Sequence, residues 1–176
     1  SLVGQNVDRN FVPSVEKGAM RACEEGIIAG YRVVDVKIEF YDGKMHPVDS
    51  KDIAFQTAGY YAFKEAFTAA RPCMLEPINT IEIRIPDDCM GKVMGDLSSR
   101  RGKIQGMDVD GSFQVIKAHV PAKELYRYSS TLRSLTGGRG VHVEDFSHYE
   151  EMPREAEAKL VEEYKKHRQD GNGHHE

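Results

Sequence analysis

The side chains that could do chemistry in this chain are scattered along it. Asp87 and Asp88 are adjacent carboxylates at an expected helix start, where such residues cap the helix, so we expect no acid–base pair. His142 and His148 lie on or beside an expected strand without the cysteines or grouped carboxylates of a metal site. The glycine run 137–140 is too short for a dinucleotide fingerprint, and the chain has neither a G-x-x-x-x-G-K-[S/T] loop nor a G-x-S-x-G elbow. The sequence therefore predicts no catalytic site, metal ion or cofactor within this chain.

Cations near two expected helix ends form the other group of candidates. Arg100, Arg101 and Lys103 follow one helix, and Arg133 and Arg139 lie near the end of a later one. Cations at such positions are favoured by the helix dipole, and they can also bind phosphate groups of RNA. From the residues alone, a solvated helix end and an RNA-facing patch both stay open.

The overall charge is evidence against strong, non-specific nucleic-acid binding. The chain has 176 residues and a formal net charge of −4. Residues 1–72 carry 9 Lys/Arg against 10 Asp/Glu, residues 73–153 carry 10 against 12, and residues 154–176 carry 5 against 6. Phosphate contacts need a local surplus of cations, so any RNA contact must come from small patches.

Neither a membrane nor an oxidising compartment is indicated. The sequence has no run approaching the roughly 20 apolar residues that span a bilayer, and we expect no signal peptide. Its three cysteines, Cys23, Cys73 and Cys89, are widely spaced and odd in number. A disulfide framework is therefore not expected, and the reducing cytoplasm is the predicted location.

Residues 1–72 predict a small α/β unit. Apolar residues at helical spacing predict a helix over Val12–Glu25, with Pro13 in its first turn and Gly26 as its stop. The alternation from Val34 to Phe40 predicts a half-buried strand, and the turn signal Asp42-Gly43 predicts a second short strand over 45–48.

A second helix should follow that hairpin. Asp49 or Ser50 can cap it, and it should run to about Ala70. We expect an apolar stripe of this helix to pack on the sheet; its members are Ala54, Ala58, Tyr61, Ala62 and Phe67. One hairpin is marginal as a sheet, so we expect a βαβ-type domain that lacks N-terminal strands.

Residues 73–153 predict a complete second domain. Strands are expected around Ile81–Ile85, over Lys103–Val109, over Phe113–Val120 and over Val141–Phe146. Helices are expected from Met90 to before Gly102 and from Leu125 to Gly137-Gly138. The order βαββαβ is that of a ferredoxin-like fold, which makes the chain α+β. Beyond Pro153 we expect a C-terminal helix over Arg154–Arg168 and a disordered tail from Gln169 to Glu176.

An ordered series of segments resembles the C-terminal part of elongation factor G, a translational GTPase. Similarity to its fourth domain is carried by Phe11–Gly18, Ala29–Val36, Asp42–Ser50, Ala54-Phe55 and Ala62–Ala66. Similarity to its fifth domain is carried by Leu75–Pro77, Gly91–Leu97, Arg100–Gly102, Leu132–Thr136, Gly138-Arg139 and Phe146–Glu150. The resemblance covers about residues 3–153 in the same order and spacing, which makes it far more specific than a single short motif.

The resemblance implies a role on the ribosome. In that family the fourth domain, similar to small-subunit ribosomal proteins, reaches the decoding region during translocation of tRNA and mRNA. The tip residues implied here are Gly4, Gln5, Asn6, Asp42, Gly43, Lys44, His46 and Asp49. A lysine and an imidazole on a glycine turn suit contact with an RNA backbone and a base. The family's fifth domain lies by large-subunit RNA, which makes Arg100, Arg101, Lys103, Arg133 and Arg139 candidate contacts. GTP and magnesium would belong to the N-terminal GTPase domains of the whole protein, which are partners implied for this chain.

Two departures from the family pattern lie in the implied tip. The first tip loop is Gly4-Gln5-Asn6-Val7-Asp8 where the family has a Gly-Gly-Val-Ile-Pro type of run, and Pro47 follows His46 where Asp is common. A ribosome-recycling or ribosome-protection relative therefore stays open beside a translocation factor. A free-standing RNA-binding module is another alternative, although Phe113 is the single aromatic residue in the expected hairpin strands. A ferredoxin-like regulatory domain that binds a small molecule is a third.

Overall fold

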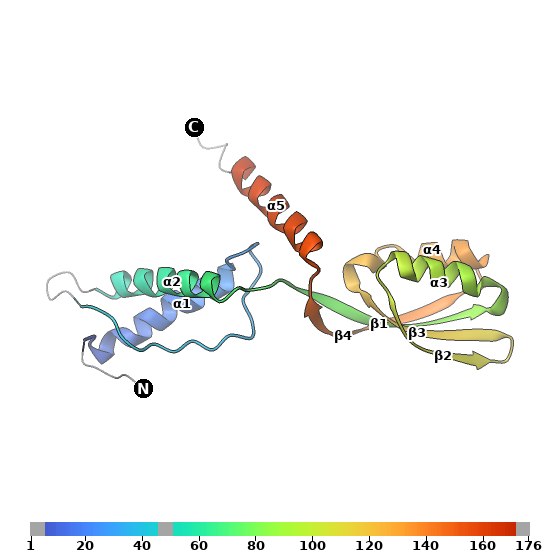
Figure 1. The fold of residues 1–176 in the computed structure, drawn as a ribbon, viewed down its shortest axis with the longest axis horizontal. Coiled ribbons are helices and arrows are strands. Elements are labelled where there is room, and N and C mark those ends of the chain that lie inside the picture. Colours follow the sequence, from blue (N-terminus) through green and yellow to red (C-terminus); the bar gives the residue numbers. More distant parts are fainter. Residues whose placement is uncertain (1–5, 46–50, 172–176) are drawn as a thin grey trace. The chain divides into compact units, whose positions relative to one another are not determined.

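The computed structural model describes residues 6–45 and 51–171 (Figure 1). The chain divides into two compact units, Ser1–Met74 with Pro153–Glu176 and Leu75–Met152, here called unit 1 and unit 2. Within the described ranges, no helix has the length and apolar character to cross a membrane.

Two helices in direct backbone contact form the centre of unit 1. Helix α1 spans Val12–Glu25 after a short 3₁₀ turn, η1 (Arg9–Phe11), and helix α2 spans Asp52–Ala69. A Cβ atom on Gly18 would lie 1.9 Å from the carbonyl oxygen of Gln56, and one on Gly59 would lie 2.3 Å from that of Val15. Glycine is therefore required at both positions, because any side chain would push the helices apart.

The expected strand over Val34–Phe40 is not present as a strand. Residues 31–45 follow an extended course but are not paired in any sheet. The alternation does not separate a buried face from an exposed one, because Asp35 and Glu39 line the same groove of about 860 Å³ against α1 as Val34, Val36 and Ile38. These three apolar residues remain 45–54% exposed, because no second strand in the described part of unit 1 offers a hydrogen-bonding ladder. The expected second strand over 45–48 lies mostly outside the described residues.

The apolar stripe expected on α2 was also wrong. Ala54, Ala58 and Ala62 are exposed, and Tyr61 is 62% exposed. The buried residues are Phe55 and Gly59, which face α1. The prediction failed because α2 has apolar residues around most of its circumference, so that spacing alone did not identify the packed face.

Unit 2 is a four-stranded antiparallel sheet whose one face is covered by two helices (Figure 1). Along the chain the elements are β1 (Leu75–Pro86), η2 (Asp87–Cys89), α3 (Met90–Ser99), β2 (Lys103–Asp110), β3 (Phe113–Pro121), η3 (Ala122–Leu125), α4 (Tyr128–Thr136) and β4 (Val141–Glu151). The strand order is β2-β3-β1-β4. This arrangement confirms the ferredoxin-like prediction.

The core of unit 2 lies between the sheet and its helices. Alternate residues of β1 (Ile81, Ile83 and Ile85) are fully buried, as are Val93 and Leu97 of α3. Gly137 closes α4 in the left-handed conformation, with φ at 60°. These are the features that the sequence pattern predicted.

The C-terminal helix α5 spans Arg154–Gly171. It is longer than expected, because Gln169, which we placed in a disordered tail, is helical. Residues 172–176 lie outside the described residues. Within unit 1, the Glu157 carboxylate accepts a hydrogen bond from the Met74 amide at 3.1 Å.

Candidate functional site

The described ends of the two expected tip segments meet in unit 1. The Asn6 side-chain amide donates to the Asp42 carboxylate at 3.0 Å, across 36 residues of sequence. The Gly43 amide donates to the same oxygen at 2.8 Å. A Cβ atom on Gly43 would lie 2.8 Å from a methyl group of buried Val7, so glycine permits this close approach.

One cation of the expected tip lies next to this contact between Asn6, Asp42 and Gly43. Lys44 follows Gly43 and is exposed. The other expected tip residues, Gly4, Gln5, His46 and Asp49, lie outside the described residues. The structure thus brings Asn6, Asp42 and Gly43 together.

The five expected large-subunit contacts do not form one patch. Arg100 lies inside unit 2, with a side chain 17% exposed. Its guanidinium donates to the Asp96 carboxylate at 2.9 Å, to the Thr131 hydroxyl at 3.2 Å and to the Glu124 carbonyl oxygen. It also lies 5.0 Å above the Tyr128 ring. These contacts fasten α3 to the segment containing η3 and α4, which occupies the donors that a phosphate would need.

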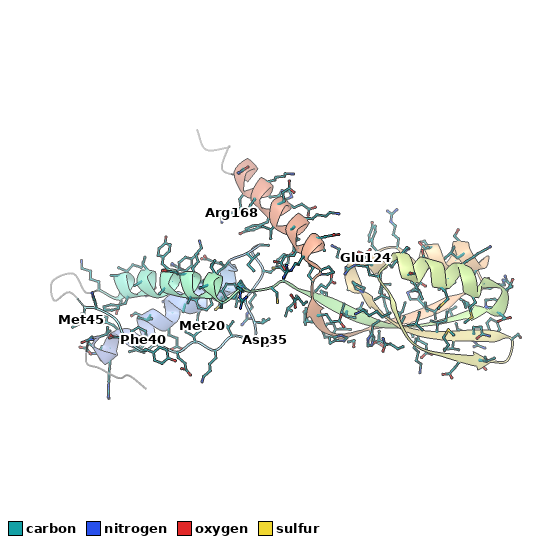
Figure 2. All side chains as sticks on the ribbon, in the orientation of Figure 1. Met20, Asp35, Phe40, Met45, Glu124 and Arg168 are labelled. Atoms are coloured by element: carbon teal, nitrogen blue, oxygen red, sulfur yellow. The ribbon has the colours of Figure 1, made fainter. Side chains whose placement is uncertain are left out.

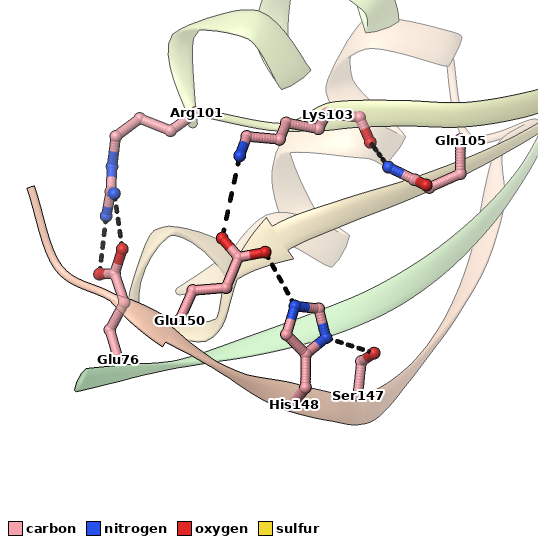
Figure 3. A network of polar contacts seen from close by, with 7 residues as sticks. All are labelled: Glu76, Arg101, Lys103, Gln105, Ser147, His148 and Glu150. Atoms are coloured by element: carbon pink, nitrogen blue, oxygen red, sulfur yellow. Dashed lines mark hydrogen bonds and ion pairs between the residues drawn. The ribbon is translucent and has the colours of Figure 1, made fainter.

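Arg101 is held by a carboxylate in the same way (Figure 3). Its guanidinium forms a bidentate pair with Glu76, at 2.7 and 3.0 Å, and the Glu76 side chain is 5% exposed. This hydrogen bonding raises the pKa of Arg101. Arg101 also adopts a φ of 59°, which a non-glycine residue seldom does. The pair joins the end of α3 to β1.

The other three cations differ in their contacts and in their exposure to solvent. The Lys103 ammonium is 73% exposed and lies 3.8 Å from the Glu150 carboxylate (Figure 3). The Arg139 guanidinium pairs with Asp88 at 3.1 Å and donates to the Thr136 carbonyl oxygen at 3.0 Å. Arg133 is exposed on α4.

Charge in unit 2 is separated between its layers. The strands carry three cations (Arg84, Lys103, Lys117) against eight anions (Glu76, Glu82, Asp108, Asp110, Glu144, Asp145, Glu150, Glu151). The segments 87–102 and 122–140, here called the helix layer, carry seven cations (Lys92, Arg100, Arg101, Lys123, Arg127, Arg133, Arg139) against four anions (Asp87, Asp88, Asp96, Glu124). The helix layer is therefore the side of unit 2 suited to an anionic partner.

A polar network occupies part of the strand layer (Figure 3). His148 contacts the Ser147 hydroxyl and the Glu150 carboxylate, each at 2.8 Å, and its ring lies 5.2 Å from that of His119. The hydrogen bond with His148 lowers the pKa of Glu150. His142 packs against the Tyr128 ring at 4.9 Å. Among the described residues, no three His, Cys, Asp or Glu side chains are arranged to hold a metal ion.

Comparison with known proteins gives this chain a family. Residues 1–71 match the family model "Elongation factor G, domain IV", and residues 73–160 match "Elongation factor G C-terminus". The chain belongs to the elongation factor G family. It is 51% identical to elongation factor G of Aquifex pyrophilus over 160 residues, which is 91% of this chain and 23% of that protein.

A solved structure is similar to nearly the whole chain. A crystal structure of a protein from Thermus thermophilus matches with a TM-score of 0.78 and 37% identity, over 94% of this chain and 25% of that one. The chain thus spans about a quarter of the length of these two proteins. It corresponds to domain IV and the C-terminal domain.

Two exposed residues of the elongation factor G C-terminal region escaped the sequence analysis. Tyr126 and Arg127 precede α4, and Tyr126 is 74% exposed. A signal was present in the sequence: both residues lie between Leu125 and Tyr128, which with Leu132 and Leu135 form the apolar stripe of the expected helix. Tyr126 and Arg127 fall outside that spacing, and both are exposed in the structure.

Proposed function

We propose that this chain is the ribosome-engaging C-terminal part of an elongation factor G-type translational GTPase, which promotes movement of tRNA and mRNA. The observation that carries the proposal is the hydrogen bond between Asn6 and Asp42, which joins two tip segments in a region that matches domain IV. Positioning RNA requires that the two segments be held together, and this hydrogen bond joins their described ends.

In this proposal the tip acts by position and contact, without proton transfer. Lys44 supplies a charge to phosphate, and His46 donates a hydrogen bond or stacks on a base in the decoding region. Gly4, Gln5, Asn6, Asp42, Gly43 and Asp49 shape the two loops around them.

The test compares the full-length protein with its His46→Ala variant. Ribosome binding is measured by sedimentation with a non-hydrolysable GTP analogue, and translocation by single-turnover kinetics. We expect binding to persist and translocation to slow by about 10-fold or more, because positioning of the reacting complex is lost. His167→Ala, on the exposed side of α5, is the matched control. An unchanged translocation rate in His46→Ala would exclude the tip assignment.

A recycling or ribosome-protection relative is the second candidate. It is favoured by the departures of the tip from the family pattern, in Gly4–Asp8 and at Pro47. Ribosome binding by the wild-type protein without any translocation would select this candidate over the first.

We further propose that the helix layer of unit 2 faces ribosomal RNA, with Arg133 as a phosphate contact, Arg139, Arg100 and Arg101 at or behind that face, and Lys103 beside it at the start of β2. Each phosphate contact contributes about 0.7–0.9 to the slope of log affinity against log salt concentration. Arg133→Ala should reduce the slope by that amount. Lys117→Ala is the control, because Lys117 lies in the anionic strand layer, 3.6 Å from Glu82. Equal slopes in the wild type and Arg133→Ala would exclude the contact.

The remaining partners belong to the full-length protein. GTP and magnesium would bind its N-terminal GTPase domains, because this chain has no phosphate-binding loop of the P-loop type. Those domains and the ribosome are the partners proposed for this chain. A cytoplasmic location follows from that role.

The domain organisation proposed is 1–72, 73–153 and 154–176, with the first domain completed by further strands. The support is the unpaired extended segment 31–45, whose apolar residues line the groove against α1. Met20 of α1 and Phe40 lie along this groove (Figure 2). Amide hydrogen exchange would test the idea. Residues 34–40 should exchange more slowly in the full-length protein than in this chain alone, and equal rates would refute it.

A further inference from the structure

We propose that Tyr126 and Arg127 form a platform on which an unpaired RNA base stacks. The inference rests on the proposed function, because it assigns a specific contact to the helix layer of unit 2. The ligand class is single-stranded or looped RNA, in which a base is free to leave its neighbours.

The two side chains form an exposed stacked pair. Tyr126 is the most exposed tyrosine or phenylalanine among the described residues at 74%, and the Arg127 guanidinium lies 5.2 Å from the centre of its ring. A ring and a guanidinium are both flat, and both stack on nucleobases. Because the guanidinium lies over one face of the ring, a base can stack on the other ring face or on the outer side of the guanidinium.

The backbone that carries Tyr126 and Arg127 is held by buried neighbours. Tyr126 and Arg127 are flanked by Leu125, which is 8% exposed, and Tyr128, which is 1% exposed. Burial of both neighbours fixes the corner between η3 and α4. Stacking on a fixed surface loses less entropy than stacking on a mobile loop.

Arg127 adopts a conformation that favours glycine. Its φ is 56° and its ψ is 22°, which is the left-handed region. Glycine would adopt this turn without strain, so folding alone does not explain an arginine here. A charged, planar group over the face of the Tyr126 ring is explained if the pair binds RNA.

The surrounding charge fits RNA better than a protein surface. Residues 122–140 carry Lys123, Arg127, Arg133 and Arg139 against Glu124 alone. Glu124, at the end of the helix layer (Figure 2), lies 3.7 Å from the Arg101 guanidinium, which reduces its repulsion of phosphate. An apolar protein partner would gain nothing from these cations, and an acidic peptide would leave the ring unused. A base with its phosphates uses both.

The first test is binding of the full-length protein to purified ribosomes with a non-hydrolysable GTP analogue. Loss of one stacked base should weaken the Tyr126→Ala complex about 10-fold, whereas Tyr126→Phe should bind as the wild type does. Arg127→Gly should weaken binding while melting no lower than the wild type, because glycine relieves the left-handed turn. Tyr149→Ala is the control, since Tyr149 is 61% exposed on β4 in the strand layer.

A second test identifies the partner. A photoreactive benzophenone amino acid at position 126 of the full-length protein should crosslink to ribosomal RNA. Crosslinks to ribosomal protein alone, or equal affinities of the wild type and Tyr126→Ala, would overturn the platform and leave the proposed function standing. Failure of the wild-type protein to bind ribosomes at all would overturn both.

Discussion

Replacing Arg101 with methionine should selectively destabilise unit 2. The substitution keeps an unbranched, flexible side chain but leaves the Glu76 carboxylate, which is 5% exposed, without its bidentate partner at 2.7 and 3.0 Å. Breaking a fully buried pair in this way costs about 3–5 kcal/mol. Because Arg101 itself is 35% exposed, water reaches the vacated side of the carboxylate, so we expect about 2–3 kcal/mol. In a domain of this size the melting temperature should fall by about 10–20 °C.

The assay is a thermal melt combined with amide hydrogen exchange, which assigns the loss to β1 and β4 of unit 2. The double variant Arg101→Met/Glu76→Met should recover most of the stability, because no charge is left buried without a partner. Unit 1 provides the internal control, since exchange in α1 should not change. Wild-type stability in the single variant, or a double variant no more stable than the single one, would refute this account of the pair.

Three further predictions concern single positions. Gly59→Ala should lower the free energy of unfolding by at least about 2 kcal/mol, because the new Cβ would lie 2.3 Å from the backbone of α1. Gly95→Ala should instead stabilise α3 by about 1 kcal/mol, because its Cβ would meet nothing within 4 Å. Urea denaturation measures both changes. Tyr128→Phe should stabilise unit 2 by about 1 kcal/mol in thermal melts, because the buried Tyr128 hydroxyl has no partner among the described residues. The pKa of folded Glu150 lies below its ordinary value of 4.5, so the stability that its charged form contributes is present above pH 4.5 and is lost as the pH falls through the folded pKa. In thermal melts from pH 3 to 6, the melting temperature of His148→Ala should therefore fall less steeply with pH than that of the wild type.

The sequence predicted most accurately the parts whose packing is local. Helix α1 begins and ends at the predicted residues, Val12 and Glu25, since its apolar spacing, Pro13 and Gly26 all lie within the segment itself. The elements of unit 2 were predicted in order for a related reason. Its central strands β1 and β3 alternate over part of their length because one face packs on helices and the other is open, whereas β2 and β4 are largely exposed.

The sequence-based predictions were wrong where a segment packs against a partner that the sequence does not identify. The alternation over Val34–Phe40 predicted a strand, but a strand also needs a neighbour to pair with, and the described part of unit 1 offers none. The packed face of α2 was set by Gly18 and Gly59, small residues that a search for apolar stripes passes over. The pairing of Arg101 with Glu76 joins residues 25 apart in sequence, and no local pattern indicates it.

The net charge of a segment does not show where its charged residues lie in the fold. Residues 73–153 carry 10 cations and 12 anions, and this balance was evidence against RNA binding. In a βαββαβ fold the chain passes alternately through the sheet and the helices, so a mixed sequence is sorted into two layers. Most of the anions lie in strands and most of the cations in the helix layer. An anionic partner that approaches the helices is affected mainly by the charge of that layer, because screening at physiological salt limits the reach of the strand carboxylates to about 8 Å. A negative net charge is therefore compatible with an RNA-binding face on this domain.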